Sequence, residues 1–145
     1  MRTRTLLLLA IVCGVIILVA GGIQLVRLTD QQQASVQLNR NQAGRAGDAS
    51  VTLRDVAVEG EPSVERTVVT VDIGGVDDSS GLGGFTLVGV GEVARIDAAA
   101  STCIGIVEAE RRCDLVFNTA EFPSGARQLI FRRADTQLRW VLPTA

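Results

Sequence analysis

The sequence predicts an all-β domain, an antiparallel β-sandwich of about seven strands, preceded by one transmembrane α-helix. Residues 5–26 contain no charged side chain. From residue 51 onward, short runs alternate apolar and polar residues between turn-forming residues, which is the pattern of half-buried strands. A length of 145 residues, 47% of them hydrophobic, suffices for one domain with a packed core but not for two.

The apolar segment 6–26 has the length of a membrane-spanning helix. Its 21 residues extend about 31 Å as an α-helix, which matches the hydrocarbon core of a bilayer. Two arginines lie among residues 1–5, so the positive-inside rule keeps these residues in the cytoplasm and exports the C-terminal part. A cleaved signal peptide, with the small or compact residues Val19-Ala20-Gly21 at the cleavage site, is the alternative. The apolar run continues to Val26, which favours an uncleaved signal anchor.

Small residues lie on one face of this segment. Ala10, Gly14 and Gly21 are spaced four and seven residues apart, which places them on the same side of a helix. Small side chains let a second membrane helix approach closely. We therefore expect the lipid bilayer as the partner of residues 6–26, and a homodimer through these three residues as a further partner.

Residues 27–50 are predicted to form a polar linker. The segment is rich in Gln, Asn, Ala and Gly and contains no aromatic residue. Glycines favour a flexible chain. The folded domain is therefore expected to comprise residues 51–145.

The alternating runs predict the strands of this domain in order. They cover residues 51–58, 65–73, 85–90, 92–96, 114–118, 127–133 and 138–142. The run 65–73 is the clearest of them, because Val69, Val71 and Ile73 fall on one face. The predicted core consists of Val69, Val71, Phe85, Leu87, Leu115, Phe117, Leu129, Phe131 and Trp140.

Two cysteines lie in the polar part of the chain. Cys103 and Cys113 are separated by nine residues, and in an exported domain a disulfide is the expected state of such a pair. Two free thiols are the alternative. Zinc is disfavoured, because two thiolates supply half of a tetrahedral site.

The composition excludes several kinds of chemistry. The sequence contains no His, and all 14 basic residues are Arg. A histidine-based triad, a histidine metal site and a phosphate-loop lysine are therefore absent. Residues 51–145 contain nine arginines and fourteen carboxylates, a balance that disfavours binding to nucleic acid. We predict no catalytic, cofactor-binding or metal-ligating residue.

Two loops carry the candidate contact residues. The glycine-rich loop 74–84 contains Asp77 and Asp78, and is predicted to be a turn; calcium binding through these carboxylates is the alternative. The segment between the cysteines is predicted to be the exposed tip of a disulfide-closed hairpin. It contributes the candidate partner contacts Glu108, Glu110, Arg111 and Arg112, because loops on a rigid scaffold commonly carry recognition.

The strand pattern also indicates a family. The pattern includes Phe85-Thr86-Leu87, the cysteine pair, Asp114-Leu115-Val116-Phe117, Glu121-Phe122-Pro123 and Leu138-Arg139-Trp140-Val141-Leu142. Residues 51–145 with these features resemble the immunoglobulin-like domain of unknown function found in bacterial, especially actinobacterial, membrane-anchored and secreted proteins. The resemblance implies an immunoglobulin-like sandwich, an extracytoplasmic location at the bacterial cell membrane and a binding role. The family has no established catalytic residues.

Together these features predict a non-enzymatic, membrane-tethered extracytoplasmic module that binds a protein or an envelope ligand. An accessory subunit of a membrane or secretion apparatus is the first alternative, because its membrane helix would assemble it with other subunits. A carrier of a small ligand or a metal is the second alternative, and it would require a deep pocket in the sandwich.

Overall fold

The computed structural model describes the backbone of residues 3–30 and 34–143. The chain forms two compact units, which meet in the sequence between residues 33 and 34. The first unit contains a helix and the second, called here the β domain, contains the strands.

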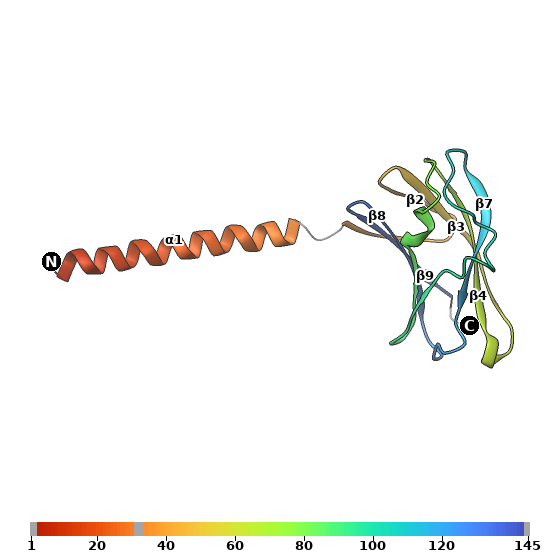
Figure 1. The fold of residues 1–145 in the computed structure, drawn as a ribbon. Helices are drawn as coiled ribbons and strands as arrows, with labels where there is room; N and C mark the ends of the chain where they lie inside the picture. The colour runs from red at the N-terminus through yellow and green to blue at the C-terminus, as the bar shows by residue number, and fades with distance from the viewer. Residues whose placement is uncertain (1–2, 31–33, 144–145) are drawn as a thin grey trace. The chain divides into compact units, whose positions relative to one another are not determined.

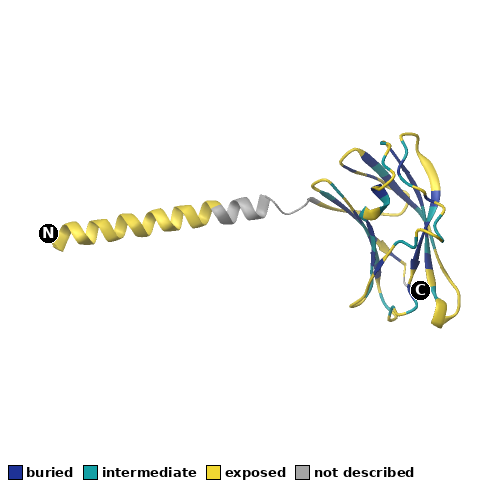
Figure 2. Ribbon diagram, viewed as in Figure 1, coloured by how far each residue is buried: buried dark blue, intermediate teal, exposed yellow. Residues whose placement is uncertain are grey.

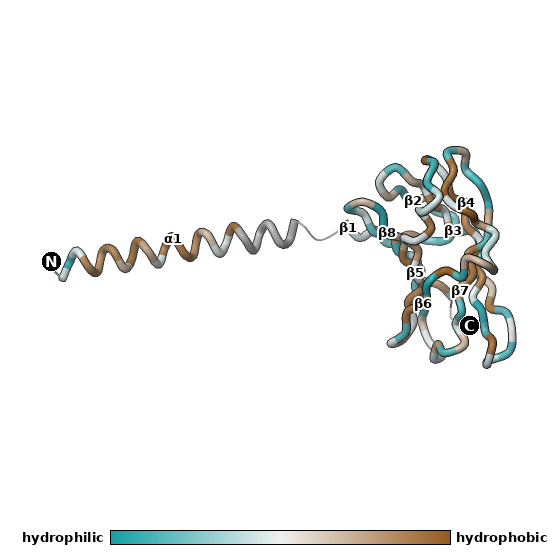
Figure 3. The backbone as a smooth tube through the Cα atoms, in the orientation of Figure 1, coloured by the Kyte–Doolittle hydropathy of each residue, from teal (hydrophilic) through white to brown (hydrophobic). Residues whose placement is uncertain are grey.

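Helix α1 (Thr3–Asp30) contains the predicted membrane segment and continues beyond it. All side chains described along it, from residue 3 to residue 23, are exposed, and most of this stretch is strongly hydrophobic (Figure 3). Residues Thr3–Ile23 are long and apolar enough to cross a membrane. An apolar surface of this length is unfavourable in water, whereas a helix satisfies its own backbone in lipid.

The β domain consists of two sheets packed face to face (Figure 1). The strands are β1 (Ala34–Leu38), β2 (Ala43–Ala46), β3 (Ala49–Glu59), β4 (Arg66–Gly74), β5 (Phe85–Val88), β6 (Val93–Arg95), β7 (Arg111–Asn118), β8 (Arg127–Arg133) and β9 (Thr136–Leu142). Short 3₁₀ helices cover Pro62–Val64 and Gly81–Gly84. One sheet has the order β1-β9-β8-β5-β6 and the other β2-β3-β4-β7. The predicted all-β fold in two layers after an apolar helix is therefore confirmed.

The core lies between the two sheets, as the buried residues show (Figure 2). All nine predicted core residues are buried, with at most 1% of their surface exposed. The rings of Phe85 and Phe131 stack with centroids 4.3 Å apart. The predicted burial of Trp140 is confirmed. Period-two alternation identified these positions because each strand has one face on the core and one on solvent.

The predicted linker is wrong for residues 34–50. This stretch contains β1 and β2, so the domain begins at Ala34 rather than at residue 51, and the described part has nine strands rather than seven. Leu38 and Ala46 are buried in the core, but the strands around them are short and polar because they form sheet edges. One pair also departs from the predicted antiparallel arrangement, since β1 runs parallel to β9.

The strand registers give the sandwich two distinct ends. Ala34 pairs with Thr136 at the start of β9, and Ile73 pairs with Arg111 at the start of β7. The loops 75–84 and 104–110 therefore lie at the same end as the start of β1, called here the Ala34 end. Loops 60–65 and 119–126 lie at the opposite end, where Thr119 donates a backbone hydrogen bond to Glu65.

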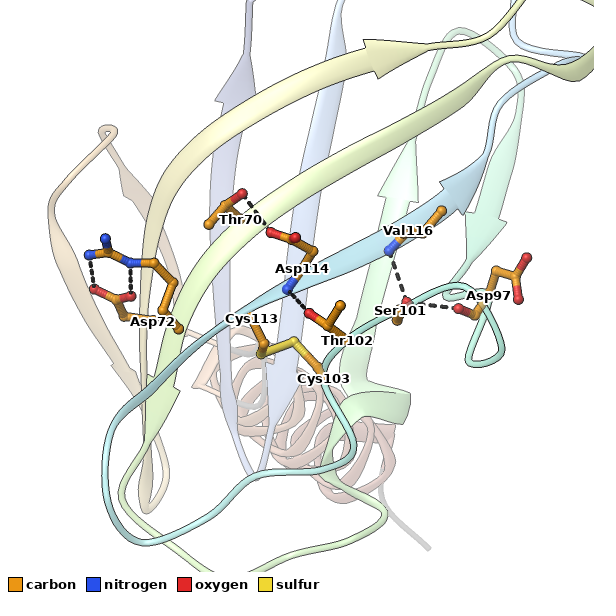
Figure 4. The surroundings of a disulfide bond; sticks show 10 residues. Thr70, Asp72, Asp97, Ser101, Thr102, Cys103, Cys113, Asp114 and Val116 are labelled. Carbon is orange, nitrogen blue, oxygen red and sulfur yellow. Dashed lines mark hydrogen bonds and ion pairs between the residues drawn. A yellow bond between two sulfur atoms is a disulfide. The ribbon is translucent and has the colours of Figure 1, made fainter.

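The predicted disulfide between Cys103 and Cys113 is present, and it fastens residues 97–103 along the outer edge of β7 (Figure 4). The backbone N–H of Asp114 donates to Thr102 Oγ1 at 2.7 Å, and that of Val116 donates to Ser101 Oγ at 2.9 Å. The backbone N–H groups of Asp97 and Thr102 donate to the carbonyls of Val116 and Asp114. This segment thus hydrogen-bonds a strand edge that would otherwise be open to pairing with another chain.

Removal of the disulfide is expected to loosen this edge. In the β domain, the double variant Cys103→Ala/Cys113→Ala should lose about 2–3 kcal/mol of stability, because the short covalent loop no longer restricts the unfolded chain. Hydrogen exchange followed by mass spectrometry should show faster exchange in residues 97–103 and at the amides of Asp114 and Val116. The amides of β8 and β9 serve as the internal control. Unchanged exchange in residues 97–103 would contradict this role of the disulfide.

Candidate functional site

The two loops that the sequence singled out separately lie against each other at the Ala34 end. Asp78 and Ile106 form an antiparallel bridge, with N–H to carbonyl distances of 2.9 Å in both directions. The backbone N–H of Glu108 donates to Asp77 Oδ1 at 3.1 Å, and that of Gly75 donates to the Glu108 carbonyl at 3.1 Å. The loops 75–84 and 104–110 therefore form one unit, called here the paired loops.

The close approach of the paired loops depends on glycine at two positions. A Cβ atom on Gly74 would lie 2.7 Å from the Cα atom of Glu110, and one on Gly105 would lie 3.0 Å from the Cα atom of Ser79. These distances leave little or no room for a side chain, because the neighbouring atoms belong to the backbone. The glycine-rich composition of loop 74–84 thus serves packing as well as turn formation.

An ion-pair network ties the paired loops to β8. The guanidinium of Arg133 donates to Asp78 Oδ2 at 2.7 Å and to Asp48 Oδ1 at 2.5 Å. The backbone N–H and the hydroxyl of Ser80 donate to Asp78 Oδ1. The hydrogen bond from Arg133, followed by those from Ser80, lowers the pKa of Asp78 to about 2. The same network lowers the pKa of Asp48 and raises that of Arg133.

An open hollow of about 450 Å³ lies on the surface of the paired loops. Ile106, which is 2% exposed, is part of its apolar wall, whereas Ile104 is 83% exposed. Asp77 and Arg111 contribute one charge of each sign. This combination suits contact with an apolar side chain of a larger partner, flanked by polar groups.

The structure places the candidate contact residues in different surroundings. Asp77, Asp78 and Glu108 are brought together in the paired loops, and Arg111 lines the hollow. Glu110 is exposed where its backbone passes Gly74. The predicted hairpin tip is wrong, because residues 104–110 pair with the loop after β4 instead of folding back on themselves.

Arg112 does not take part in the hollow. Its guanidinium bonds the carboxylate of Asp72 on the outer face of the four-stranded sheet, at 2.8 and 3.2 Å (Figure 4). Arg54 donates to the same carboxylate at 2.5 Å. Hydrogen bonds from Arg112 and then Arg54 lower the pKa of Asp72 and hold it ionised. Arg112 points to the outer face because successive residues of a strand alternate between faces, and its neighbour Cys113 points to the core.

The alternative of a calcium site in loop 74–84 gains no support. The carboxylate of Asp78 is bonded to Arg133 and Ser80, and that of Asp77 accepts the N–H of Glu108. Within the described parts of the chain, no group of three or more His, Cys, Asp or Glu side chains is arranged to hold a metal ion.

Sequence reasoning missed three residues that shape this site. Ile104 is an isolated apolar residue between Cys103 and Gly105, so no periodicity indicates whether it is exposed. Arg133 and Asp48 lie 85 residues apart, and their pairing follows from the sheet topology. No local signal in the sequence identifies either contact.

Comparisons with known proteins give little further information. No family model matches the chain, and no curated protein matches it. The crystal structure of the secreted protein MPT63 from Mycobacterium tuberculosis is similar over 73% of this chain and 96% of its own length. The TM-score is 0.49 and the sequence identity is 11%.

The bond between Asp78 and Arg133 predicts an acid-dependent stability. Because the folded pKa of Asp78, about 2, lies below its ordinary value of 3.8, the bond stabilises the fold above pH 3.8 and is lost as the pH falls toward 2. Asp78→Asn should lower the melting temperature at pH 7 and flatten its fall between pH 4 and pH 2. Asp135→Asn, in the exposed β8–β9 turn, is the matched control. Thermal unfolding followed by circular dichroism tests this, and parallel pH curves for Asp78→Asn and wild type would contradict it.

Proposed function

We propose that this protein is a non-enzymatic interaction module, held at the outer face of a bacterial cytoplasmic membrane by α1, that binds a protein or an envelope ligand through the paired loops. The β domain is proposed to be an immunoglobulin-like sandwich. The exposed Ile104, held beside the hollow by a disulfide and a backbone bridge, is the observation that carries this proposal.

Membrane attachment is supported by the exposed apolar side chains of α1. Arg2 and Arg4 precede this segment and favour a cytoplasmic N-terminus. A disulfide in the β domain fits an oxidising compartment outside the cytoplasm. The bilayer is therefore the proposed partner of residues 6–26. A homodimer through Ala10, Gly14 and Gly21 remains a prediction.

The immunoglobulin-like assignment is supported by the order of the strands. If β4, β5, β7, β8 and β9 correspond to immunoglobulin strands B, C, E, F and G, then B pairs with E in one sheet and C, F and G share the other. Residues 97–103 then lie beside E, where strand D would be. The disulfide and Trp140 depart from the usual positions of the cysteines and tryptophan in antibody domains.

The hollow supports a macromolecular partner more than a small ligand. It is an open surface feature rather than an enclosed cavity, and small ligands are usually bound in sites that bury most of their surface. An exposed isoleucine beside charged residues is instead suited to the centre of a protein interface, where apolar anchors contribute most of the binding energy.

The proposed topology predicts the labelling of cysteines introduced one at a time into the full chain, in which Cys13 is replaced by Ser and the Cys103–Cys113 disulfide is kept. In intact spheroplasts, Asp135→Cys should react with a membrane-impermeant maleimide, because the β8–β9 turn would face outward. Thr3→Cys is the matched control and should react only after permeabilisation. The opposite labelling pattern would refute export of the β domain.

The proposed binding surface predicts position-dependent crosslinking. A photoreactive amino acid at position 104 of the full chain in its native membrane should give a discrete adduct, because this side chain would lie in the interface. The same amino acid at the exposed Val90, at the opposite end of the domain, is the control and should not give this adduct. Arg111→Ala should lower the yield at position 104. Equal patterns from both positions would refute a role of the paired loops.

A further inference from the structure

The two sheets of the β domain differ sharply in charge. The five strands of the β1-β9-β8-β5-β6 sheet contain no Asp or Glu. The strands of the other sheet contain Asp55, Glu59, Asp72 and Asp114. An arginine in the five-stranded sheet can therefore form an ion pair only with a carboxylate from outside that sheet.

Two of these arginines do find such partners. Arg127 bonds Glu65 at 2.6 Å, and Arg133 bonds Asp48 and Asp78. The remaining three, Arg95, Arg132 and Arg139, form no ion pair with any residue that the structure describes. Three unpaired cations thus belong to one sheet.

These three arginines lie on the same, outer face of the sheet. Arg132 on β8 and Arg139 on β9 alternate with the buried core residues Phe131, Leu138 and Trp140, and Arg95 on β6 follows the buried Ala94. The register places Arg139, Ile130, Thr86 and Arg95 in one row across β9, β8, β5 and β6. Because neighbouring strands are about 4.8 Å apart, Arg139 and Arg95 are separated by about 14 Å of sheet surface.

The local contacts favour an external partner for these cations. Arg132 Nε donates to Gln137 at 2.9 Å, so a neutral amide orients it without neutralising it. Arg139 Nε is buried and has no hydrogen-bond partner in the described part of the chain. Arg95 is exposed.

The outer face of the other sheet provides an internal comparison. There, Arg54 and Arg112 share the carboxylate of Asp72, and Thr70 donates to Asp114 at 2.7 Å. Arg54 and Arg112 are therefore paired within the domain, whereas Arg45, Arg66 and Arg111 of the same sheet form no ion pair with a residue that the structure describes. The two sheets differ because the strands of this one contain carboxylates. The arginines on the outer face of the five-stranded sheet form no such pair, although Glu92 and Glu121 line the same surface hollow as Arg95.

We propose that this arginine face, defined by Arg95, Arg132, Arg139 and Ile130, binds an acidic segment of a partner protein. Carboxylates of the partner would pair with the three guanidiniums, and its apolar side chains would contact Ile130 between Arg139 and Arg95. Guanidinium groups suit this role because they bind carboxylates through two parallel hydrogen bonds.

The face fits a polypeptide better than a polyanion. Its charges are few and separated, and apolar side chains, including the exposed Val93 and Val141, lie among them. A polyanion gains its affinity from many adjacent cations.

The proposal goes beyond the function proposed for the paired loops, because the residues of the two surfaces do not overlap. The test uses the full chain in phosphatidylcholine nanodiscs and a fluorescent peptide of alternating Glu and Val, with a matched peptide of Gln and Val. Fluorescence anisotropy should show binding of the Glu peptide. Arg139→Gln, and separately Arg95→Gln/Arg132→Gln, should raise its dissociation constant about tenfold, as expected for loss of charged hydrogen bonds.

Two control variants make the result specific. Arg66→Gln removes an exposed cation from the other sheet, and Ile104→Ser alters the paired loops. Both variants should leave the dissociation constant of the Glu peptide unchanged within about twofold. This is well below the tenfold change that corresponds to about 1.4 kcal/mol. Melting curves establish that every variant is folded. Binding that survives Ile104→Ser but fails at the arginines supports this proposal independently of the paired loops.

Three outcomes would overturn the proposal. One is absence of Glu-peptide binding, and another is equal binding of the Gln peptide, since contact would then not depend on carboxylates. The third is binding of inorganic polyphosphate, but not of the Glu peptide, with the same dependence on the three arginines. That result would assign the face to a polyanion.

Discussion

The outer edge of β7 imposes the constraint on which the rest of the β domain depends. Its N–H and C=O groups cannot remain unpaired beside a packed core, and no further strand follows β7 in its sheet. Residues 97–103 solve this problem with the hydroxyls of Ser101 and Thr102 together with their own backbone. The disulfide holds the last residue of this segment, Cys103, against β7. It therefore determines where residues 104–110 begin. The hollow of the paired loops is thus a consequence of how the edge is covered.

The position of a strand in its sheet determines whether the sequence predicts it. Strands such as β4 have one face in the core, so Val69, Val71 and Ile73 alternate with polar residues and identify the strand directly. Strands β1 and β2 lie at edges, and their polar residues resemble those of a linker. The disulfide was predictable because spacing and the expected compartment both favour it. By contrast, the bond between Arg133 and Asp78 depends on sheet order, which residue spacing does not encode.

Charge is distributed between the sheets in a way that composition conceals. The β domain contains eleven arginines and fifteen carboxylates from residue 34 onward, yet the five-stranded sheet contains no carboxylate. In the other sheet, Asp72 is held ionised between two arginines, which stabilises the fold at neutral pH and engages all three charges. The net charge of the β domain therefore does not indicate the charge on the outer face of either sheet.

The two proposed surfaces make different physical demands on a partner. At the paired loops, Ile104 is the dominant exposed group, so affinity would come mainly from burial of apolar surface and would depend weakly on salt. At the arginine face, the cations supply the specificity, and salt would weaken binding by screening the exposed charges. A partner that contacts both surfaces would need an apolar side chain for one and carboxylates for the other. A single bivalent partner would therefore lose affinity when either surface is altered, whereas each of two independent partners would respond to changes at one surface alone.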